Sequence, residues 1–337
     1  MKTLQWKTCI VGFGKIGARY SDDLLMKSQY KFSTHIEVLN EHPNFKLIAV
    51  IDPCKDALNI AENKWKVENT FQVLEGNFLE NTELLILSNP PENRLSILRK
   101  FSNLRAVIIE KPIGKSFDES KNILDYAKEE GIHAQVNFIR RYDDYHRSLA
   151  SGELARKVGI IQISNCYYGN GILNNASHMI DLALMFFGTP NAVGSINSGR
   201  VINQSPIKND INFSFFLEYQ DFSIFFHPID FNFYREVSME FYGSRGYLRI
   251  SQEGLIENYS EKKQNRALTN AYEIPFDRIQ QTSTSIGKAF YNLYNNMHDV
   301  LMNKDDPLSS IESAVECEII ISKLLFSQKN NNTKINL

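Results

Sequence analysis

The chain has 337 residues, enough for two domains, and its 43% hydrophobic and 23% charged content is ordinary for a globular protein. A formal net charge of −2 provides no overall basic field for nucleic acid or an anionic membrane, and no apolar run approaches the roughly 18 residues of a membrane-spanning helix. The four cysteines are scattered without a metal-binding spacing, so we expect buried thiols, no metal site and a cytoplasmic protein without a signal peptide.

Short apolar runs alternate with helical stretches through the first part of the chain. The predicted strands are residues 8–11, 46–51, 84–87, 107–109 and 133–136. These runs are apolar throughout, as expected for strands that are buried on both faces of a parallel sheet. Ser116 and Glu119 form a capping box at the start of one intervening helix, and Gly131 ends that helix. The alternation predicts a doubly wound parallel sheet, the Rossmann type, over residues 1–140.

The pattern changes after about residue 140. The predicted elements are strands 160–168, 211–219, 222–226, 238–242 and 247–250, with helices 175–187 and 309–325. We therefore expect a second α/β domain over residues 141–306, built on a large open and mostly antiparallel sheet. A C-terminal helix at 307–327 is expected to pack back on the first domain, and residues 328–337 are expected to form a frayed tail. The predicted fold class is α/β.

A glycine-rich turn follows the first predicted strand directly. Residues 12–17 read GFGKIG, in which Gly12, Gly14 and Gly17 surround Lys15 and Ile16. In a dinucleotide-binding turn the first glycine allows the tight bend, the second lets backbone N–H groups approach a pyrophosphate, and the third lets the helix pack closely on the strand. The position after a buried strand favours this interpretation over a ligand-free turn.

Asp52 ends the second predicted strand. A carboxylate there can accept hydrogen bonds from both ribose hydroxyls of NAD and would repel the 2′-phosphate of NADP, so NAD is the favoured cofactor. Asp52 lies 35 residues after Gly17, more than the usual roughly 20, which an insertion around residues 21–32 would explain. The alternative interpretation of Asp52 is a helix N-cap or turn residue.

Lys111 follows the strand at 107–109 within the sequence Glu110-Lys111-Pro112. The carboxyl ends of parallel strands face the crevice where such sheets bind ligands. There an ammonium group can hydrogen-bond a substrate hydroxyl or carbonyl, and partial desolvation would bring its pKa into a useful range. The alternative is a solvated lysine.

Asn174 and His178 stand four residues apart at the start of the apolar helix, so they share one face of it. Asp181, three residues further on, is a candidate to hold the imidazole tautomer. The loop Gly169-Asn170-Gly171 would allow a ligand to approach closely. A core histidine without a catalytic role remains the alternative.

In these features the chain resembles the Gfo/Idh/MocA oxidoreductases, a family that includes glucose–fructose oxidoreductase and inositol dehydrogenase. The resemblance covers residues 7–325 and rests on these segments: GFGKIG (12–17), AVID ending at Asp52, SNPPENR (88–94), EKP (110–112), NFIRRY (137–142), YGNGILNNASHMID (168–181) and FYGSRGYLRI (241–250). It implies an NAD-dependent dehydrogenase or reductase of carbohydrate metabolism that acts on a CH–OH group of a sugar, sugar nucleotide or cyclitol. It also implies a homodimer or homotetramer.

The resemblance assigns roles residue by residue. Lys111 resembles the family's proton-relay lysine, and His178 resembles its catalytic histidine. The positions that line the nicotinamide pocket in the family are Ser88, Pro90, Asn93 and Glu110. Two residues depart from the pattern. Asn174 stands where such dehydrogenases carry an aspartate, and an amide is no carboxylate base; Arg94 stands where many members carry a histidine.

Arg141, Tyr142 and Tyr168 complete the expected substrate site together with Asn174 and His178. The tyrosines are candidates to stack on a sugar ring, and the arginine is a candidate to meet a phosphate or carboxylate. Two alternatives stay open. One is a catalytically silent NAD-binding sensor or partner protein, which Asn174 suggests. The other is a dehydrogenase or reductase of a non-sugar substrate, such as an amino-acid-like or biliverdin-like ligand.

Overall fold

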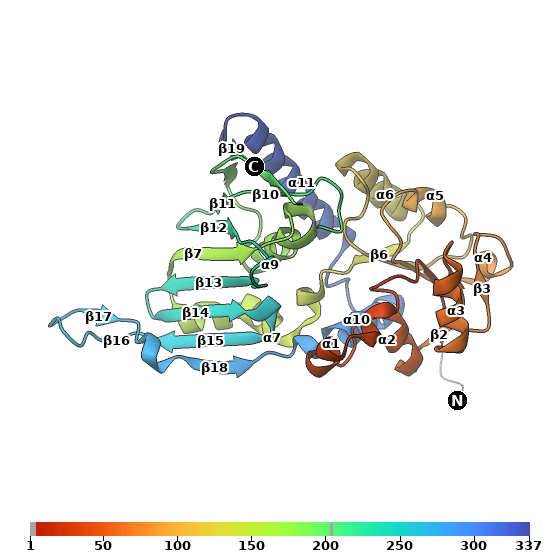
Figure 1. Ribbon diagram of the computed structural model, residues 1–337, viewed down its shortest axis with the longest axis horizontal. Coiled ribbons are helices and arrows are strands. Elements are labelled where there is room, and N and C mark those ends of the chain that lie inside the picture. Colours follow the sequence, from red (N-terminus) through yellow and green to blue (C-terminus); the bar gives the residue numbers. More distant parts are fainter. Residues whose placement is uncertain (1–4, 203–204) are drawn as a thin grey trace. The chain divides into compact units, whose positions relative to one another are not determined.

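The computed structural model describes residues 5–202 and 205–337, and the chain forms two compact units (Figure 1). Unit 1 comprises Met1–Tyr142 and Gly287–Val315, and unit 2 comprises Asp143–Ile286 and Glu316–Leu337. Residues 1–4 of the first expected domain and residues 203–204 of the second lie outside the described residues. The sequence places residues up to 306 in the second domain, whereas the segment from Gly287 onward belongs to unit 1.

Unit 1 is built on a six-stranded sheet in which every paired strand is parallel. The strands are β1 (Trp6–Val11), β2 (Phe45–Ile51), β3 (Thr70–Phe71), β4 (Leu84–Leu87), β5 (Ala106–Ile109) and β6 (His133–Val136). Their order is β3-β2-β1-β4-β5-β6, so the direction of winding reverses between β1 and β4. Ligands bind at this kind of switch point in doubly wound sheets. The predicted Rossmann-type sheet is confirmed, with β3 as an addition.

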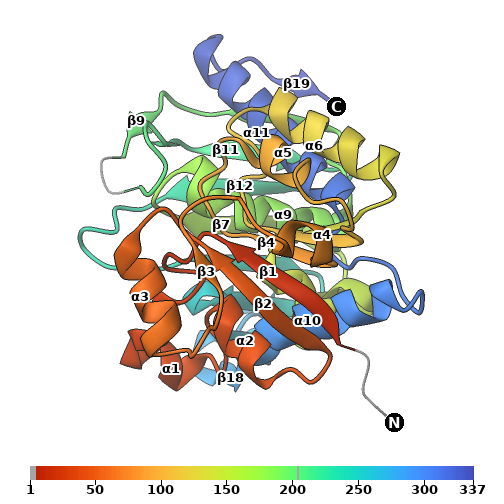
Figure 2. The same ribbon diagram turned by 90° about the vertical axis from the view of Figure 1, so that its right-hand side faces the viewer.

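Helices cover the sheet of unit 1 (Figure 2). The helices of unit 1 are α1 (Leu24–Gln29), α2 (His35–Glu41), α3 (Lys55–Asn63), α4 (Phe78–Asn81), α5 (Arg94–Leu98), α6 (Phe117–Glu129) and α10 (Ala289–Leu301), with 3-10 turns at Arg19–Asp22 and Ile139–Tyr142. Helix α10 is not among the elements predicted from the sequence. Its buried residues Phe290, Leu293, Met297 and Leu301 recur every three or four positions, which is a helical pattern.

The wide spacing between Gly17 and Asp52 comes from an inserted segment, residues 18–34. The backbone N–H of His35 donates to the carbonyl oxygen of Ile16 at 3.1 Å, and that of Ile36 donates to Gly17 at 3.1 Å, so the helical path resumes where it was interrupted. Without these residues, Asp52 would follow Gly17 after 18 positions, close to the usual roughly 20. The predicted insertion is therefore real but slightly longer than residues 21–32.

Unit 2 contains a nine-stranded sheet in the order β18-β15-β14-β13-β7-β12-β11-β8-β19. The strands are β7 (Ile161–Tyr168), β8 (Ala192–Ser195), β11 (Phe215–Glu218), β12 (Ser223–Pro228), β13 (Ser238–Gly243), β14 (Gly246–Ser251), β15 (Ile256–Glu261), β18 (Gln280–Ser283) and β19 (Ile335–Asn336). Only β7 and β12 pair in parallel. The predicted open, mostly antiparallel sheet is confirmed.

Short elements surround this sheet. They are the two-stranded pairs β9 (Arg200–Val201) with β10 (Ile211–Asn212) and β16 (Lys263–Gln264) with β17 (Tyr272–Glu273), and the helices α7 (Asp144–Ser148), α8 (Leu154–Val158) and α9 (Ser177–Phe187). Single turns lie at Leu149–Glu153, Ile172–Ala176, Gln252–Gly254 and Phe276–Arg278, while Ile286–Lys288 and α11 (Ile311–Lys329) each cross from one unit to the other.

One face of the large sheet forms the core of unit 2. Phe215 and Phe226 stack there with ring centroids 4.3 Å apart, and both are fully buried. Phe187 of α9 packs edge-on against Phe241 of β13 at 5.9 Å, so this helix covers the same face. Aromatic pairs of this geometry stabilise a core beyond the burial of their area.

Two predicted elements of unit 2 differ in the structure. The expected strand 211–219 is broken between β10 and β11, because both backbone polar groups of Phe213 hydrogen-bond the hydroxyl of Tyr168 instead of a neighbouring strand. The expected frayed tail is paired instead. Ile335 lies opposite Val193 on β8, and the N–H of Leu337 donates to the carbonyl of Asn191 at 3.0 Å. Without the tail, the backbone N–H and C=O groups on that edge of β8 would have no strand to pair with, which explains the pairing.

A buried polar cluster fixes the start of unit 2. The carboxylate of Asp143 caps α7 and accepts hydrogen bonds from the His146 imidazole and the Ser285 hydroxyl. Desolvation by burial raises the pKa of Asp143, but the hydrogen bond and charge of His146 and the hydrogen bond from Ser285 outweigh it, so the pKa lies below its usual value.

This cluster predicts an acid-sensitive contribution to stability. An acid whose folded-state pKa is lowered stabilises the fold above its unfolded pKa of about 3.9, and the contribution is lost as the pH falls through the folded-state value. We expect Asp143→Asn to lower the free energy of unfolding by about 3 kcal/mol at pH 7, as for one partner removed from a buried pair. The difference from the wild type should shrink below about pH 4 in urea titrations. A constant difference from pH 7 to pH 3 would contradict this role.

Candidate active site

The glycine-rich turn lies at the switch point of the sheet in unit 1. Gly12 has a φ of 94°, and a side chain there would clash with the backbone of Asn89 after β4. A Cβ on Gly17 would come within 2.8 Å of the Gly12 carbonyl oxygen, whereas a Cβ on Gly14 would meet no atom within 4 Å. The turn is therefore packed against backbone atoms at Gly12 and Gly17 and is open at Gly14, which Lys15 and Ile16 follow. These residues fit a cradle for a pyrophosphate.

Asp52 holds this turn in place. Its Oδ2 accepts the N–H of Phe13 at 2.6 Å, and its Oδ1 accepts the N–H of Cys54 at 2.8 Å. Asp52 therefore has the turn-stabilising role that was the alternative interpretation of this residue from the sequence. Each carboxylate oxygen has a second lone pair, so the same side chain can still accept a ribose hydroxyl.

The loops after β4 and β5 are tied together by Arg94. Its buried guanidinium donates to the carbonyl oxygens of Glu110, Pro112 (2.5 Å), Ile113 (3.2 Å) and Asn89. Arginine can serve several acceptors at once because its guanidinium carries five N–H donors in a fixed plane. The residue that departs from the family pattern therefore orders the loop that carries Lys111.

The other expected nicotinamide-pocket residues lie along the same loop. Ser88 donates its hydroxyl to the carbonyl oxygen of Gly12 at 2.6 Å. Pro90 is exposed, and Asn93 adopts a left-handed conformation (φ 64°) before α5. Ser88 is thereby joined directly to the glycine-rich turn.

Glu110 is held by two buried side chains, those of His35 and Asn137. His35 Nε2 lies 3.1 Å from Glu110 Oε1, and Asn137 Nδ2 donates to the same oxygen at 2.6 Å. The second imidazole nitrogen, Nδ1, lies 2.7 Å from the hydroxyl of Tyr294 on α10. An unprotonated Nδ1 that accepts from the tyrosine and an Nε2–H that donates to the carboxylate satisfy all of these contacts. His35 thus orients the residue before Lys111.

Lys111 itself is half-buried, directly after Glu110 and in a cis peptide bond with Pro112. It belongs to unit 1, while Asn174 and His178 belong to unit 2. Within unit 1 the structure joins the glycine-rich turn to Ser88 and Asp52, and the Lys111 loop to Arg94.

The second group of candidate residues lies in unit 2, with Asn174 on the turn before α9 and His178 in the first turn of α9. Asn170 and Gly171 both have positive φ values, 53° and 93°, and lead into a π-helical turn at Ile172–Ala176 that continues as α9. Asn174 and His178 are both partly exposed, although most of this helix is buried. Polar side chains at the accessible start of an otherwise apolar helix are candidates for ligand contact.

Asp210 fixes the conformation of this turn. Its carboxylate accepts the backbone N–H groups of Leu173 at 3.1 Å and Asn174 at 2.9 Å. Asp210 is 1% exposed, and a side chain on Gly171 would collide with it. Burial raises the pKa of Asp210 even though these N–H donors oppose the change. No local sequence pattern links Asp210 to a helix 36 residues earlier, so the sequence analysis missed it.

The other three residues expected at the substrate site, Arg141, Tyr142 and Tyr168, differ from one another in burial. Tyr142 and Tyr168 are fully buried; the hydroxyl of Tyr142 donates to Gln135 Oε1 at 2.7 Å, and that of Tyr168 donates to Phe213. Both tyrosines are core residues, so their expected place against a sugar ring is wrong for this conformation. Arg141 is half-buried in the turn Ile139–Tyr142.

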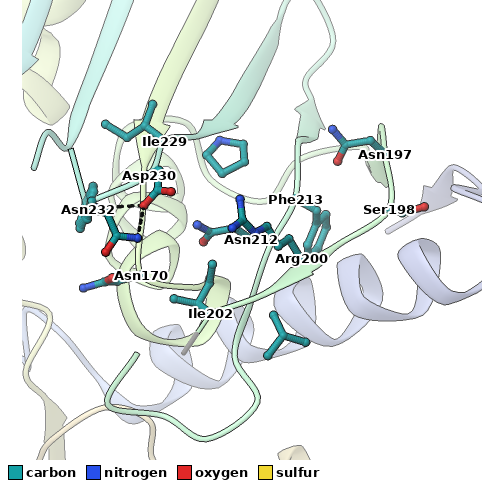
Figure 3. Close-up of a pocket in the computed structure, with 13 residues that line it drawn as sticks. Asn170, Asn197, Ser198, Arg200, Ile202, Asn212, Phe213, Ile229, Asp230 and Asn232 are labelled. Carbon is teal, nitrogen blue, oxygen red and sulfur yellow. Dashed lines mark hydrogen bonds between the residues drawn. The ribbon is translucent and has the colours of Figure 1, made fainter. Parts of the chain in front are cut away.

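A cavity of about 410 Å³ opens at the edge of the sheet of unit 2 where β7 and β12 end (Figure 3). Its polar lining includes Asn170, Asn197, Ser198, Arg200, Asn212, Asp230 and Asn232. Figure 3 shows Asp230 beside Asn232, with Arg200 and Asn212 nearer the centre. None of these side chains is a ligand contact predicted from the sequence, because they come from four separate segments.

Two further features are absent from the described residues. In residues 5–202 and 205–337, no helix combines the length and apolar character needed to cross a bilayer. The same residues contain no group of three or more His, Cys, Asp or Glu side chains arranged to share a metal ion.

Comparison with known proteins gives matches of two kinds. Residues 6–138 match the family model GFO_IDH_MocA, described as an oxidoreductase family with an NAD-binding Rossmann fold. The chain is 26% identical over 163 residues to a scyllo-inositol 2-dehydrogenase (NAD+) of Bacillus subtilis. This match covers 46% of the chain and 43% of the relative, so it spans less than half of either protein.

Solved structures match over nearly the full length. An oxidoreductase from Agrobacterium radiobacter, determined with NAD+, L-tartaric acid and magnesium, has a TM-score of 0.71 at 12% identity and 98% coverage of both chains. The super-repressor mutant of Gal80p from Saccharomyces cerevisiae has a TM-score of 0.73 at 12% identity, also with 98% coverage of both. At these identities the likeness concerns the fold. Residues 6–138 of the chain are thus similar to the NAD-binding Rossmann part of the Gfo/Idh/MocA oxidoreductase family.

Proposed function

We propose that this protein is an NAD-dependent oxidoreductase that interconverts a secondary alcohol and a ketone on a sugar, sugar nucleotide or cyclitol. The observation that carries this proposal is the glycine-rich cradle, open at Gly14, at the switch point of the parallel sheet. The similarity to a scyllo-inositol 2-dehydrogenase supports the substrate class. When bound, the nicotinamide supplies the hydride chemistry.

The chain's own residues would bind the cofactor and move the proton. Backbone N–H groups of residues 12–17 would hold the pyrophosphate, and Asp52 would accept the adenosine ribose hydroxyls. Lys111 or His178 would remove the hydroxyl proton during oxidation and return it to the alkoxide oxygen during reduction. Asn174 would hold a neighbouring hydroxyl, because an amide is no general base at neutral pH.

A titration with NADH and NADPH, followed by fluorescence, is the direct test. We expect the wild type to bind NADH more tightly than NADPH, since Asp52 would face the 2′-phosphate of NADPH. Asp52→Ser should weaken the binding of NADH much more than the binding of NADPH. Asp56→Ser, which removes a charge in the first turn of α3, serves as the control and should change the ratio little.

The result separates two roles of Asp52. Equal weakening of both cofactors in Asp52→Ser would contradict the ribose contact and leave only the hydrogen bonds to Phe13 and Cys54. Failure of the wild type to bind either cofactor would refute the proposed function.

A catalytically silent NAD-binding protein is the second candidate. Asn174 favours it, because the position lacks the carboxylate of related dehydrogenases, and so does the structural similarity to the Gal80p super-repressor mutant. Stoichiometric NADH binding without turnover of any compound in a broad sugar and cyclitol panel would support this candidate over the enzyme.

We also propose self-association through the second face of the large sheet. This face presents Ile163, Phe216, Phe225 and Tyr242, which are at least partly exposed in the single chain. Apolar surface of this kind is typical of protein interfaces. Light scattering during size-exclusion chromatography should give the mass of a dimer or tetramer, and Phe225→Glu should lower it.

A further inference from the structure

The cavity at the ends of β7 and β12 adjoins the turn that carries Asn174 and leads into α9, where His178 lies. Asn170, one of its lining residues, directly precedes Gly171, and the N–H of Gly171 donates to Oδ1 of the lining residue Asn212 at 2.8 Å. A ligand in the cavity would therefore lie beside this turn. Its volume falls within the range of about 300–1,000 Å³ for small-molecule sites.

The lining combines polar and apolar side chains. Asparagine and serine side chains offer both donors and acceptors, whereas the partly exposed Pro228, Ile229 and Phe231 contribute carbon surface. A polyhydroxylated ring has the matching properties, because its hydroxyls need both donors and acceptors and its C–H faces are apolar.

The charges of the lining balance. Among the described lining residues, Arg200 is the cation and Asp230 is the anion. Asp230 accepts the backbone N–H of Asn232 at 2.9 Å and its amide at 2.7 Å. These hydrogen bonds, together with the charge of Arg200, lower the pKa of Asp230, so it is ionised at neutral pH. An anionic ligand would meet this carboxylate as well as the guanidinium.

The nearby helix start is also closed to anions. Exposed N–H groups at the start of a helix commonly bind phosphate. Here the N–H groups of Leu173 and Asn174 are already occupied by the buried carboxylate of Asp210. A diphosphate in the cavity would therefore be attracted by Arg200 alone among the described lining residues. It would be repelled by the carboxylate of Asp230 and by that of Asp210, which is bound to the turn.

We propose that this cavity binds an uncharged sugar or cyclitol in preference to a sugar acid or sugar nucleotide, and that Arg200 and Asp230 set this preference. The assignment of the ligand as substrate rests on the proposed function, whereas its binding does not. Arg200 donates to ring hydroxyls, and Asp230 accepts from them while it repels carboxylate and phosphate groups.

Binding is tested on the full chain with NADH present, by saturation-transfer NMR with myo-inositol, glucuronate and UDP-N-acetylglucosamine as probes. We expect the wild type to bind myo-inositol most tightly. Asp230→Asn should raise the affinity for glucuronate, relative to that for myo-inositol, by about two- to fivefold, the range for one exposed charge interaction. Arg200→Gln should lower the same relative affinity by a similar factor. Asp221→Asn is the matched control, since exposed Asp221 precedes β12 at its other end.

The outcomes separate this proposal from the proposed function. Tighter wild-type binding of UDP-N-acetylglucosamine, binding of none of the probes, or an unchanged preference in Asp230→Asn would overturn the assignment of the cavity. Turnover of a sugar nucleotide would do so while supporting the enzyme. Binding of myo-inositol with the expected shifts, but without turnover of any uncharged polyol, would support the cavity assignment and count against the enzyme.

Discussion

Lys111→Ala is expected to lower turnover at least about a hundredfold, the lower end for a general acid–base group, while NADH binding stays within about threefold. Lys111 follows β5 at the ligand-binding edge of the sheet, on a loop that Arg94 and the His35–Glu110 contact hold in place. The contacts of Arg94 with the loop carbonyls and of His35 with Glu110 do not depend on the lysine side chain, so they should keep the loop ordered in this variant. The loss should appear in kcat more than in the affinity for the cofactor.

A nearby lysine provides the control for this variant. Lys115 lies in the same loop, and its exposed side chain pairs with Glu119 at 3.0 Å. Lys115→Ala should therefore leave turnover nearly unchanged. Partial recovery of Lys111→Ala by added methylamine would identify the missing group as an ammonium. Normal turnover in Lys111→Ala would remove this residue from the reaction.

His178→Ala is expected to reduce turnover by a similar factor of at least about a hundred, with little change in thermal stability. The imidazole is partly exposed on the first turn of α9, whereas the neighbours Met179 and Ile180 are buried. A catalytic histidine must reach the substrate, and a core histidine must contribute to packing. Steady-state kinetics and thermal unfolding of the same variant therefore distinguish the two roles.

A second histidine of unit 2 serves as the comparison. His227 lies on β12, where burial lowers its pKa and Asn165 is 3.3 Å from its Nε2. His227→Ala should keep turnover within about threefold. If His178→Ala instead keeps the wild-type rate and melts at a lower temperature, the core-histidine interpretation holds, and Lys111 alone would move the proton.

Much of unit 1 could be predicted because its determinants are local. The buried strands are short apolar runs, and the glycine-rich turn requires glycine at fixed offsets, so the spacing alone identifies it. The insertion between Gly17 and Asp52 could be inferred from an excess of residues. Its bounds could not, because they depend on the hydrogen bonds of His35 and Ile36 across the interruption.

The errors concern residues whose partners are distant in sequence. Tyr168 looks like a sugar-stacking residue in the chain, but its hydroxyl satisfies both backbone groups of Phe213, 45 residues later. The tail looks frayed from its asparagines, but the open edge of β8 pairs with it. In both cases a buried or edge backbone group needs a hydrogen-bond partner, and the fold decides which segment provides it.

The sequence by itself therefore determined the α/β class, the Rossmann-type sheet, the open sheet of unit 2 and the identity of the chemical candidates Lys111, Asn174 and His178. These follow from periodicity, glycine spacing and residue type, which act over a few neighbouring positions. The tertiary structure alone decided how the candidates are held: Glu110 by His35, the Lys111 loop by Arg94, and the Asn174 turn by Asp210. Such contacts join residues that are 16 to 75 positions apart, and only a folded backbone brings them within hydrogen-bond distance.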